Sequence, residues 1–206
     1  MKKSTKIRNI NLKAVITWCC AILCGITAMV QYGGSTAEAS DSVETTSFYE
    51  EEHKTEESGN GATLYKLPEN TDYTGKKCYI SYTAITDKTS LQYELQTAAC
   101  TDLDAFRLLD NRYLVSVGTY FNAPCGTYID LILENGTEIP CIVGEIKPDK
   151  LTSKRVYSAN GCASAFIVDA NETRADLWGD VSYLCDEWQS KVSSVRVYNK
   201  NYFDTL

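Results

Sequence analysis

Short segments in which apolar and polar residues alternate recur along the chain after residue 76. Alternation with a period of two, in segments rich in β-branched and aromatic residues, is typical of β-strands. Helical periodicity is weaker, and it favours a short helix over residues 91–99, a helical turn over 171–178 and a two-turn helix over 181–188. The alternating segments predict strands over residues 77–86, 113–118, 162–169 and 192–199.

Two further β-rich segments, TYIDLIL (127–133) and TEIPCIVGEI (137–146), flank Asn135 and Gly136. An Asn-Gly pair between such segments is a strong signal for a β-hairpin, because both turn residues adopt positive φ easily. A two-residue turn would place Glu134 opposite Thr137. In that register Cys125 and Cys141 are not cross-strand neighbours.

About six short strands with small helical insertions, and no strand–helix–strand repetition, predict a mostly-β domain. The expected architecture is a small six-stranded barrel with short helical insertions. We place this single domain at residues 76–206.

The N-terminal residues carry a targeting pattern. Five basic residues precede the first acidic one, Glu38, and an uncharged, largely apolar stretch occupies residues 14–32. A basic patch followed by an apolar stretch predicts either a secretory signal or a membrane anchor, and Ala37-Glu38-Ala39 suits cleavage before Ser40. Residues 1–39 are therefore a signal peptide or anchor. The protein is expected to be extracytoplasmic, either secreted or held at the membrane by residues 14–32.

Residues 40–75 are predicted to be an acidic, disordered linker, because Asp and Glu greatly outnumber Lys and Arg between residues 41 and 60. The whole chain has 20 basic and 27 acidic residues and a pI of about 4.8. This balance argues against nucleic-acid binding, which needs a basic face. The single histidine, His53, lies in the linker, which argues against histidine-based triads and multi-histidine metal sites.

Six cysteines lie beyond the apolar stretch, which permits up to three disulfides without indicating their pairing. Buried free thiols are the alternative. No C-x-x-C motif occurs among them, so a zinc knuckle is not favoured. The six are Cys78, Cys100, Cys125, Cys141, Cys162 and Cys185.

Carboxylates are the remaining candidates for acid–base chemistry. Those near predicted strand ends are Asp130, Glu145, Asp149, Asp169 and Asp180. Most acids on a small β-domain are solvated surface charges. Glu145 and Asp169 stand out because each follows an apolar strand core, where burial can raise the pKa of a carboxyl group enough to make it a usable acid.

The order of the predicted strands and turns after residue 112 resembles that of a known fold. Residues 112–145 give a strand, a turn with Pro124, Gly126 and Thr127, a strand, the Asn-Gly turn and a strand; the Phe166–Asp169 strand, a short helix and a closing strand follow. This order resembles the double-psi β-barrel of the three-Asp (3D) domain and of rare-lipoprotein-A-like proteins. It is also similar to exported clostridial-type proteins of unknown function.

This resemblance implies a cell-wall protein that acts on peptidoglycan as a glycan lyase of the lytic-transglycosylase kind. Asp169 would be the general acid that protonates the glycosidic oxygen, with Glu145 as its partner across a groove. Asp149, Thr152 and Tyr120 would contact the glycan. No metal or cofactor is implied. The alternatives are a non-catalytic glycan-binding or interaction module of the cell envelope, and a structural part of an envelope or secretion assembly.

Overall fold

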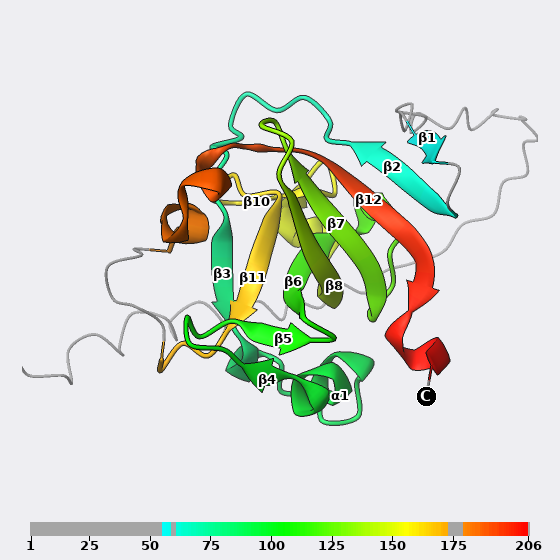
Figure 1. The fold of residues 1–206 in the computed structure, drawn as a ribbon, viewed down its shortest axis with the longest axis vertical. Helices are drawn as coiled ribbons and strands as arrows, with labels where there is room; N and C mark the ends of the chain where they lie inside the picture. The colour runs from blue at the N-terminus through cyan, green and yellow to red at the C-terminus, as the bar shows by residue number, and fades with distance from the viewer. Residues whose placement is uncertain (1–54, 59–60, 173–178, 206) are drawn as a thin grey trace, which may run out of the picture. The chain divides into compact units, whose positions relative to one another are not determined.

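The computed structural model describes residues 55–58, 61–172 and 179–205, and this part of the chain is mostly β-structure (Figure 1). Twelve strands are present in it instead of the six expected. The strands are β1 (Thr55–Ser58), β2 (Ala62–Lys66), β3 (Cys78–Ser81), β4 (Cys100–Thr101), β5 (Arg107–Leu109), β6 (Arg112–Gly118), β7 (Thr127–Leu133), β8 (Glu138–Lys147), β9 (Thr152–Ser153), β10 (Tyr157–Ser158), β11 (Ser164–Val168) and β12 (Val192–Asn201).

Ten of these strands form one mixed sheet, with the order β1-β2-β12-β7-β8-β6-β11-β3 and with β5 joining β4 to β6. The pairs β6–β8 and β11–β3 are parallel, and the other pairs are antiparallel. Within the described residues the sheet does not close into a barrel, because β1 and β3 end its path. Strands β9 and β10 pair separately.

Strand β2 pairs with β12 along its whole length, and Tyr65 of β2 is buried against the core. The sheet therefore begins before residue 76, within the residues we predicted to be linker. Composition misled the prediction here, because the apolar residues of β2 directly follow a strongly acidic stretch.

The β7–β8 hairpin is confirmed, but its loop has three residues, 134–136. Tyr128 pairs with Ile142, and the backbone N–H of Leu133 donates to Thr137 at 2.9 Å. Gly136 takes the positive φ (86°) that such loops need. The loop also docks on a neighbouring segment, since the N–H of Glu134 donates to the carbonyl of Lys191 at 2.8 Å. The local sequence pattern, which favoured a two-residue turn, gives no information on this contact with a residue remote in sequence.

Helical structure is limited. The predicted short helix is confirmed as α1 (Leu91–Ala98), which begins at Ser90, whose hydroxyl accepts from the N–H of Tyr93 at 3.2 Å. The predicted helix over 181–188 is instead two 3₁₀ helices, because Cys185 between them is extended. The helical turn expected over 171–178 lies mostly outside the described residues. The 3₁₀ helices are η2 (Tyr82–Ala84), η3 (Thr119–Phe121), η4 (Asp149–Leu151), η6 (Val181–Leu184), η7 (Asp186–Gln189) and η8 (Tyr202–Thr205).

The sheet carries apolar clusters on both faces. Along β6, Leu114 joins one cluster with Ile142 and Ile167, while Val115 and Val117 join the other. The second cluster holds an aromatic group in which Trp188 stacks on Phe166 at 5.0 Å. Burial on two faces explains why the central strands read as nearly continuous apolar runs.

One disulfide joins Cys78 of β3 to Cys162, just before β11. The other four cysteines of the described residues are free, and they include Cys125 and Cys141. Cys141 faces Ile129 across the hairpin, so these two cysteines are indeed not cross-strand neighbours. None of the helices described is long and apolar enough to cross a membrane, and the predicted segment 14–32 lies outside the described residues.

Candidate functional site

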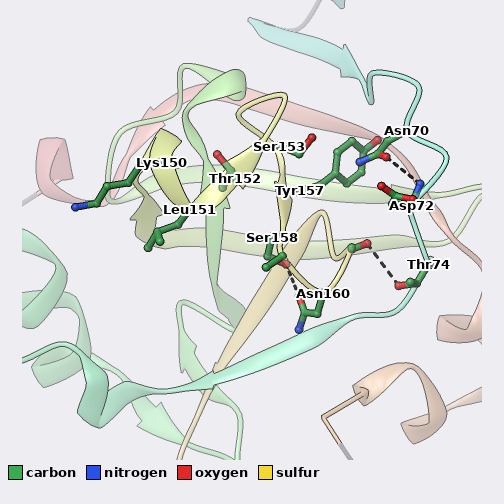
Figure 2. A pocket seen from close by; sticks show the side chains of 12 residues that line it. Asn70, Asp72, Thr74, Lys150, Leu151, Thr152, Ser153, Tyr157, Ser158 and Asn160 are labelled. Atoms are coloured by element: carbon green, nitrogen blue, oxygen red, sulfur yellow. Dashed lines mark hydrogen bonds between the residues drawn. The ribbon is translucent and has the colours of Figure 1, made fainter. Parts of the chain in front are cut away.

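A cavity of about 620 Å³ lies between residues 70–74, which precede β3, and residues 150–161. We call it the loop cavity. Figure 2 shows Asn70 and Asp72 on one side of it and Leu151 and Thr152 on the other. It is lined by Asn70, Asp72, Thr74, Lys150, Leu151, Thr152, Ser153, Tyr157, Ser158, Ala159, Asn160 and Gly161.

The two walls meet at Gly161. Its carbonyl accepts from the backbone N–H of Thr74 at 3.3 Å, and its φ is +73°. A Cβ at this position would lie 2.4 Å from the carbonyl oxygen of Asp72. Glycine is therefore required both by the backbone conformation and by the close approach of the two segments.

The wall on the 150–161 side ends in a tight turn at Ser158. The backbone N–H of Gly161 donates to the carbonyl of Ser158 at 2.8 Å, and the N–H of Ser158 donates to Cys162 at 3.0 Å. The hydroxyl of Ser158 also contacts Asn160 Oδ1 at 2.5 Å (Figure 2). Because Cys162 is disulfide-bonded to Cys78, this turn is covalently tied to β3.

Tyr157 anchors the cavity to the core. Its side chain is 2 % exposed, its hydroxyl donates to the carbonyl of Pro68 at 2.5 Å, and its ring lies 5.1 Å from that of Tyr73. Burial raises the pKa of Tyr157 to about 12. The hydroxyl is therefore a fixed hydrogen-bond donor and not an acid–base group at neutral pH.

Hydroxyl and amide side chains are the most numerous in the remaining lining, although apolar atoms supply most of its accessible surface. Four residues contribute hydroxyls beside two asparagines, one carboxylate (Asp72) and one ammonium (Lys150). Hydroxyls and amides can both donate and accept hydrogen bonds, which matches a neutral ligand with many hydroxyl groups. A single carboxylate and a single ammonium give the cavity little net charge.

Two predicted substrate-binding residues lie at this cavity. Thr152 lines it, and its hydroxyl donates to the backbone carbonyl of Asp149 at 3.2 Å. Asp149 stands beside the cavity without lining it, and its carboxylate accepts a hydrogen bond from the hydroxyl of Thr119. Asp149 thus holds η4 against the residues after β6.

Tyr120, the third predicted contact, is in the core. Its side chain is 7 % exposed, its ring packs against Tyr65 and Phe121, and its hydroxyl donates to the carbonyl of Lys66 at 3.1 Å. It does not line the loop cavity, and its assignment as a glycan contact stays a prediction.

The two predicted catalytic carboxylates do not converge. Val115 of β6 pairs with Val143 on one side and Phe166 on the other. Glu145 of β8 pairs with Ser116, the residue that follows Val115 in β6. Asp169 lies three residues after Phe166 in the chain. Because β11 is antiparallel to β6, these three residues lead away from the Ser116 end of β6. At about 3.3 Å per residue Glu145 and Asp169 are roughly 13 Å apart along the strands, and two strand spacings apart across them. Neither residue lines the loop cavity.

The Asp169 carboxylate has a local structural role. Its Oδ1 accepts from the backbone N–H of Asn171 at 3.0 Å and from the side-chain amide of Asn171 at 3.2 Å. The N–H of Asp169 donates to the carbonyl of Ala105 at 2.8 Å. These bonds end β11 and begin a turn.

Two other candidate carboxylates are buried for structural reasons. Asp130 contacts Arg112, Arg196 at 3.2 Å and the hydroxyl of Tyr198. Asp180 accepts from the backbone N–H groups of Ser182 at 3.0 Å and Lys77 at 3.3 Å. Both carboxylates therefore hold strands and caps together.

Sequence reasoning missed Asn70 and Asp72, because they lie in the predicted linker. It also missed Lys147, whose ammonium is buried without a hydrogen-bond partner among the residues that the structure describes, and whose pKa burial lowers to about 8. A lysine at the end of a β-strand gives no signal of this in the sequence.

Among the described residues, no group of three or more His, Cys, Asp or Glu side chains is placed to hold a metal ion. Comparison of the chain with protein-family models, with curated proteins and with solved structures finds no match.

Proposed function

We propose that this protein is an extracytoplasmic glycan-binding module of the cell envelope, and that the loop cavity holds the glycan. The observation that carries the proposal is the lining of this 620 Å³ cavity by hydroxyl and amide side chains. Such groups exchange hydrogen bonds with sugar hydroxyls in either direction. Gly161 and the Cys78–Cys162 disulfide fix the walls, which lowers the entropic cost of ordering them on binding.

Binding is favoured over cleavage by the positions of the acids. A glycan lyase with Asp169 as general acid and Glu145 as partner would need both groups at one glycosidic bond, and carboxylate pairs in glycosidases are within about 10 Å of each other. The strand register separates these two by more than that. The catalytic hypothesis therefore receives no support from this pair.

The ligand class and location come from the sequence. The basic and apolar N-terminal segments favour export, with residues 14–32 as the anchor if they are retained. Peptidoglycan is the glycan suggested by the resemblance to the three-Asp and rare-lipoprotein-A-like barrels. The order β6, Pro124–Thr127 turn, β7, Asn-Gly loop, β8, β11, short helices and β12 supports that relationship. The acidic composition supports a partner other than nucleic acid.

The test is co-sedimentation of the full-length protein, in detergent, with purified peptidoglycan. Asp72→Asn and Thr152→Ala, both in the loop cavity, are expected to reduce the bound fraction about five-fold or more, since the first replaces a charged acceptor oxygen with a donor and the second removes a hydroxyl. Asp104→Asn, an exposed aspartate outside the cavity, is the matched control and should bind normally. Equal binding by all four proteins would exclude this cavity.

Analysis of the soluble products separates binding from catalysis. A binding module releases no fragments. Release of anhydro-sugar fragments that Asp169→Asn abolishes would restore the lyase hypothesis and overturn this proposal.

A further inference from the structure

A smaller cavity, of about 240 Å³, lies between the residues that lead into β3 and residues 180–191. Figure 1 shows residues 180–191, drawn mainly in orange, beside the chain that enters β3, and the N–H of Val181 donates to the carbonyl of Lys77 at 2.9 Å. We call this space the lysine cavity. Pockets for drug-sized ligands measure about 300 to 1,000 Å³, so this one suits a small ion. Its described lining consists of Thr74, Gly75, Lys76, Asp180, Ser182, Tyr183, Gln189 and Lys191.

Asp180 places a hydrogen-bond acceptor in this cavity. The residue is 6 % exposed, and its Oδ1 accepts from the backbone N–H groups of Lys77 at 3.3 Å and Ser182 at 3.0 Å. Its second oxygen, Oδ2, has no hydrogen-bond partner among the described residues and is not closed off from solvent. An ionised carboxylate can only accept hydrogen bonds. A ligand beside Oδ2 must therefore bring a donor of its own.

Positive charge prevails around Asp180. Lys76 and Lys191 line the same cavity. The ammonium of Lys77 is buried and donates to the carbonyl of Ser190 at 2.7 Å. Burial lowers the pKa of Lys77, and the nearby Asp180 carboxylate opposes this shift. Three positive charges against one negative charge favour an anion here, although the whole chain has a net charge of −7.

Two of the donors in this cavity are held in position. A Cβ built on Gly75 would lie 2.5 Å from Cγ of Lys191, so the lysine side chain lies directly on the glycine backbone. The Lys191 ammonium is 5.8 Å from the centre of the Tyr73 ring. The Ser182 hydroxyl accepts from the N–H of Lys77 at 3.2 Å, which leaves its own proton free for a ligand. The cavity thus combines fixed donors with one fixed acceptor.

We propose that the lysine cavity binds hydrogen phosphate, a small anion that carries its own O–H. Its charged oxygens accept from the lysines and from Ser182, and its O–H donates to Asp180 Oδ2. Sulfate has the same shape but no proton at neutral pH, so it would bring an oxygen lone pair against Oδ2. The cavity should therefore distinguish the two ions by one hydrogen bond. This proposal is independent of glycan binding, although Thr74 lines both cavities.

The test is calorimetric titration of inorganic phosphate into the full-length protein, in detergent and in a phosphate-free buffer at pH 7.5. Sulfate and methyl phosphate are the control ligands, because a phosphate monoester loses its last proton at a pH of about 6 and then lacks an O–H. Phosphate should bind about ten-fold or more tightly than either control. Equal affinities would overturn the proposal, as would absence of phosphate binding.

Asp180→Asn tests the acceptor directly. It keeps an oxygen for the two backbone N–H groups and replaces Oδ2 with an amide donor. The variant should bind phosphate more weakly than the parent protein and gain sulfate binding by about ten-fold or more. A gain of binding cannot result from partial unfolding. Asp104→Asn, an exposed aspartate outside the cavity, should leave both affinities unchanged.

Lys191→Met is the second variant, and it retains the aliphatic chain that packs on Gly75 while removing the charge. It should weaken phosphate binding about five-fold or more. Lys88→Met, at an exposed lysine outside this cavity, is its matched control and should bind phosphate normally. An Asp180→Asn protein that still rejects sulfate would show that Oδ2 does not face the ion, and the proposed site would then be wrong.

Discussion

Cys162 is disulfide-bonded to Cys78, the first residue of β3, and stands directly after the turn that closes the loop cavity. The backbone N–H of Ser158 and the carbonyl of Cys162 are 3.0 Å apart across that turn. One covalent bond therefore links the edge of the main sheet to a wall of the candidate glycan site. Stability and binding are coupled through it.

Loss of this disulfide should lower both stability and glycan binding. The bond closes a loop of sequence separation 84, and chain-entropy arguments give about 4 to 5 kcal/mol for a loop of that size. We expect Cys162→Ser to lower the free energy of unfolding in urea by up to about that amount. Peptidoglycan co-sedimentation should fall in parallel.

The control for this change is Cys100→Ser, which alters an exposed free thiol. It should leave both measurements unchanged. A Cys162→Ser protein with unaltered binding would show that the wall keeps its shape without the bond, which contradicts the coupling.

Removing the hydroxyl of Tyr157 should loosen the base of the loop cavity. This hydroxyl donates to the carbonyl of Pro68 at 2.5 Å in a nearly inaccessible position. Tyr157→Phe should lower the free energy of unfolding by about 1 to 2 kcal/mol, since the carbonyl of the partly buried Pro68 loses this hydrogen bond. Urea denaturation measures this loss. Tyr183→Phe, at a side chain that is 71 % exposed, should change it very little.

The contribution of Lys147 to stability should rise with pH above 8, while the buried thiols of Cys125 and Cys141, whose pKa values burial raises, contribute in the opposite direction. Burial lowers the pKa of the Lys147 amine from 10.5 to about 8, while the unfolded chain keeps the ordinary value. Between these two pH values the Lys147 amine binds more proton in the unfolded state, so its contribution to the free energy of unfolding increases as pH rises. Glu145, on the same strand, opposes the shift without cancelling it.

Lys147→Met should remove this contribution, so the free energy of unfolding of the variant should fall relative to the parent protein from pH 7 to pH 9. The substitution should stabilise the protein at pH 7 by about 3 kcal/mol, because it removes the cost of burying a charge. Urea denaturation at pH 7, 8 and 9 checks both effects. Measurements should stop below pH 10, where the unfolded state begins to lose tyrosine protons that Tyr128 and Tyr157 retain in the fold. A variant with the same pH slope as the parent protein would contradict the assignment.

The fold was predictable wherever a local pattern was enough. Ser90 and the residues after it predict α1, and Asn135-Gly136 predicts the β7–β8 hairpin. The loop length was missed because the N–H of Glu134 bonds to Lys191, which is remote in sequence. The separation of Glu145 from Asp169 was missed for a related reason. Whether two strand ends meet depends on the direction of each strand in the sheet, and alternation does not record direction.

The candidate site was harder to predict. Thr152 was identified, but Asn70 and Asp72 face it across the cavity from a segment whose composition indicated a linker. Two loops distant in sequence form this cavity, and the carbonyl of Gly161 joins them by accepting from the backbone N–H and from the hydroxyl of Thr74. Contacts to a backbone carbonyl leave almost no side-chain signature other than the glycine.

Gly161→Ala should separate the walls of the loop cavity. Alanine there is strained by the φ of +73°, and its Cβ would also meet the carbonyl oxygen of Asp72 at 2.4 Å. Gly136→Ala is a matched control, because Gly136 has a φ of +86° with nothing within 4 Å of the added Cβ. The control should lose about 1 kcal/mol of unfolding free energy from backbone strain alone. Gly161→Ala should lose about 2 to 4 kcal/mol and most of its peptidoglycan binding, because backbone atoms cannot move aside as flexible side chains do. Equal losses in the two variants would mean that the close approach of the loops has no energetic weight, and the cavity would then have no rigid wall at Gly161.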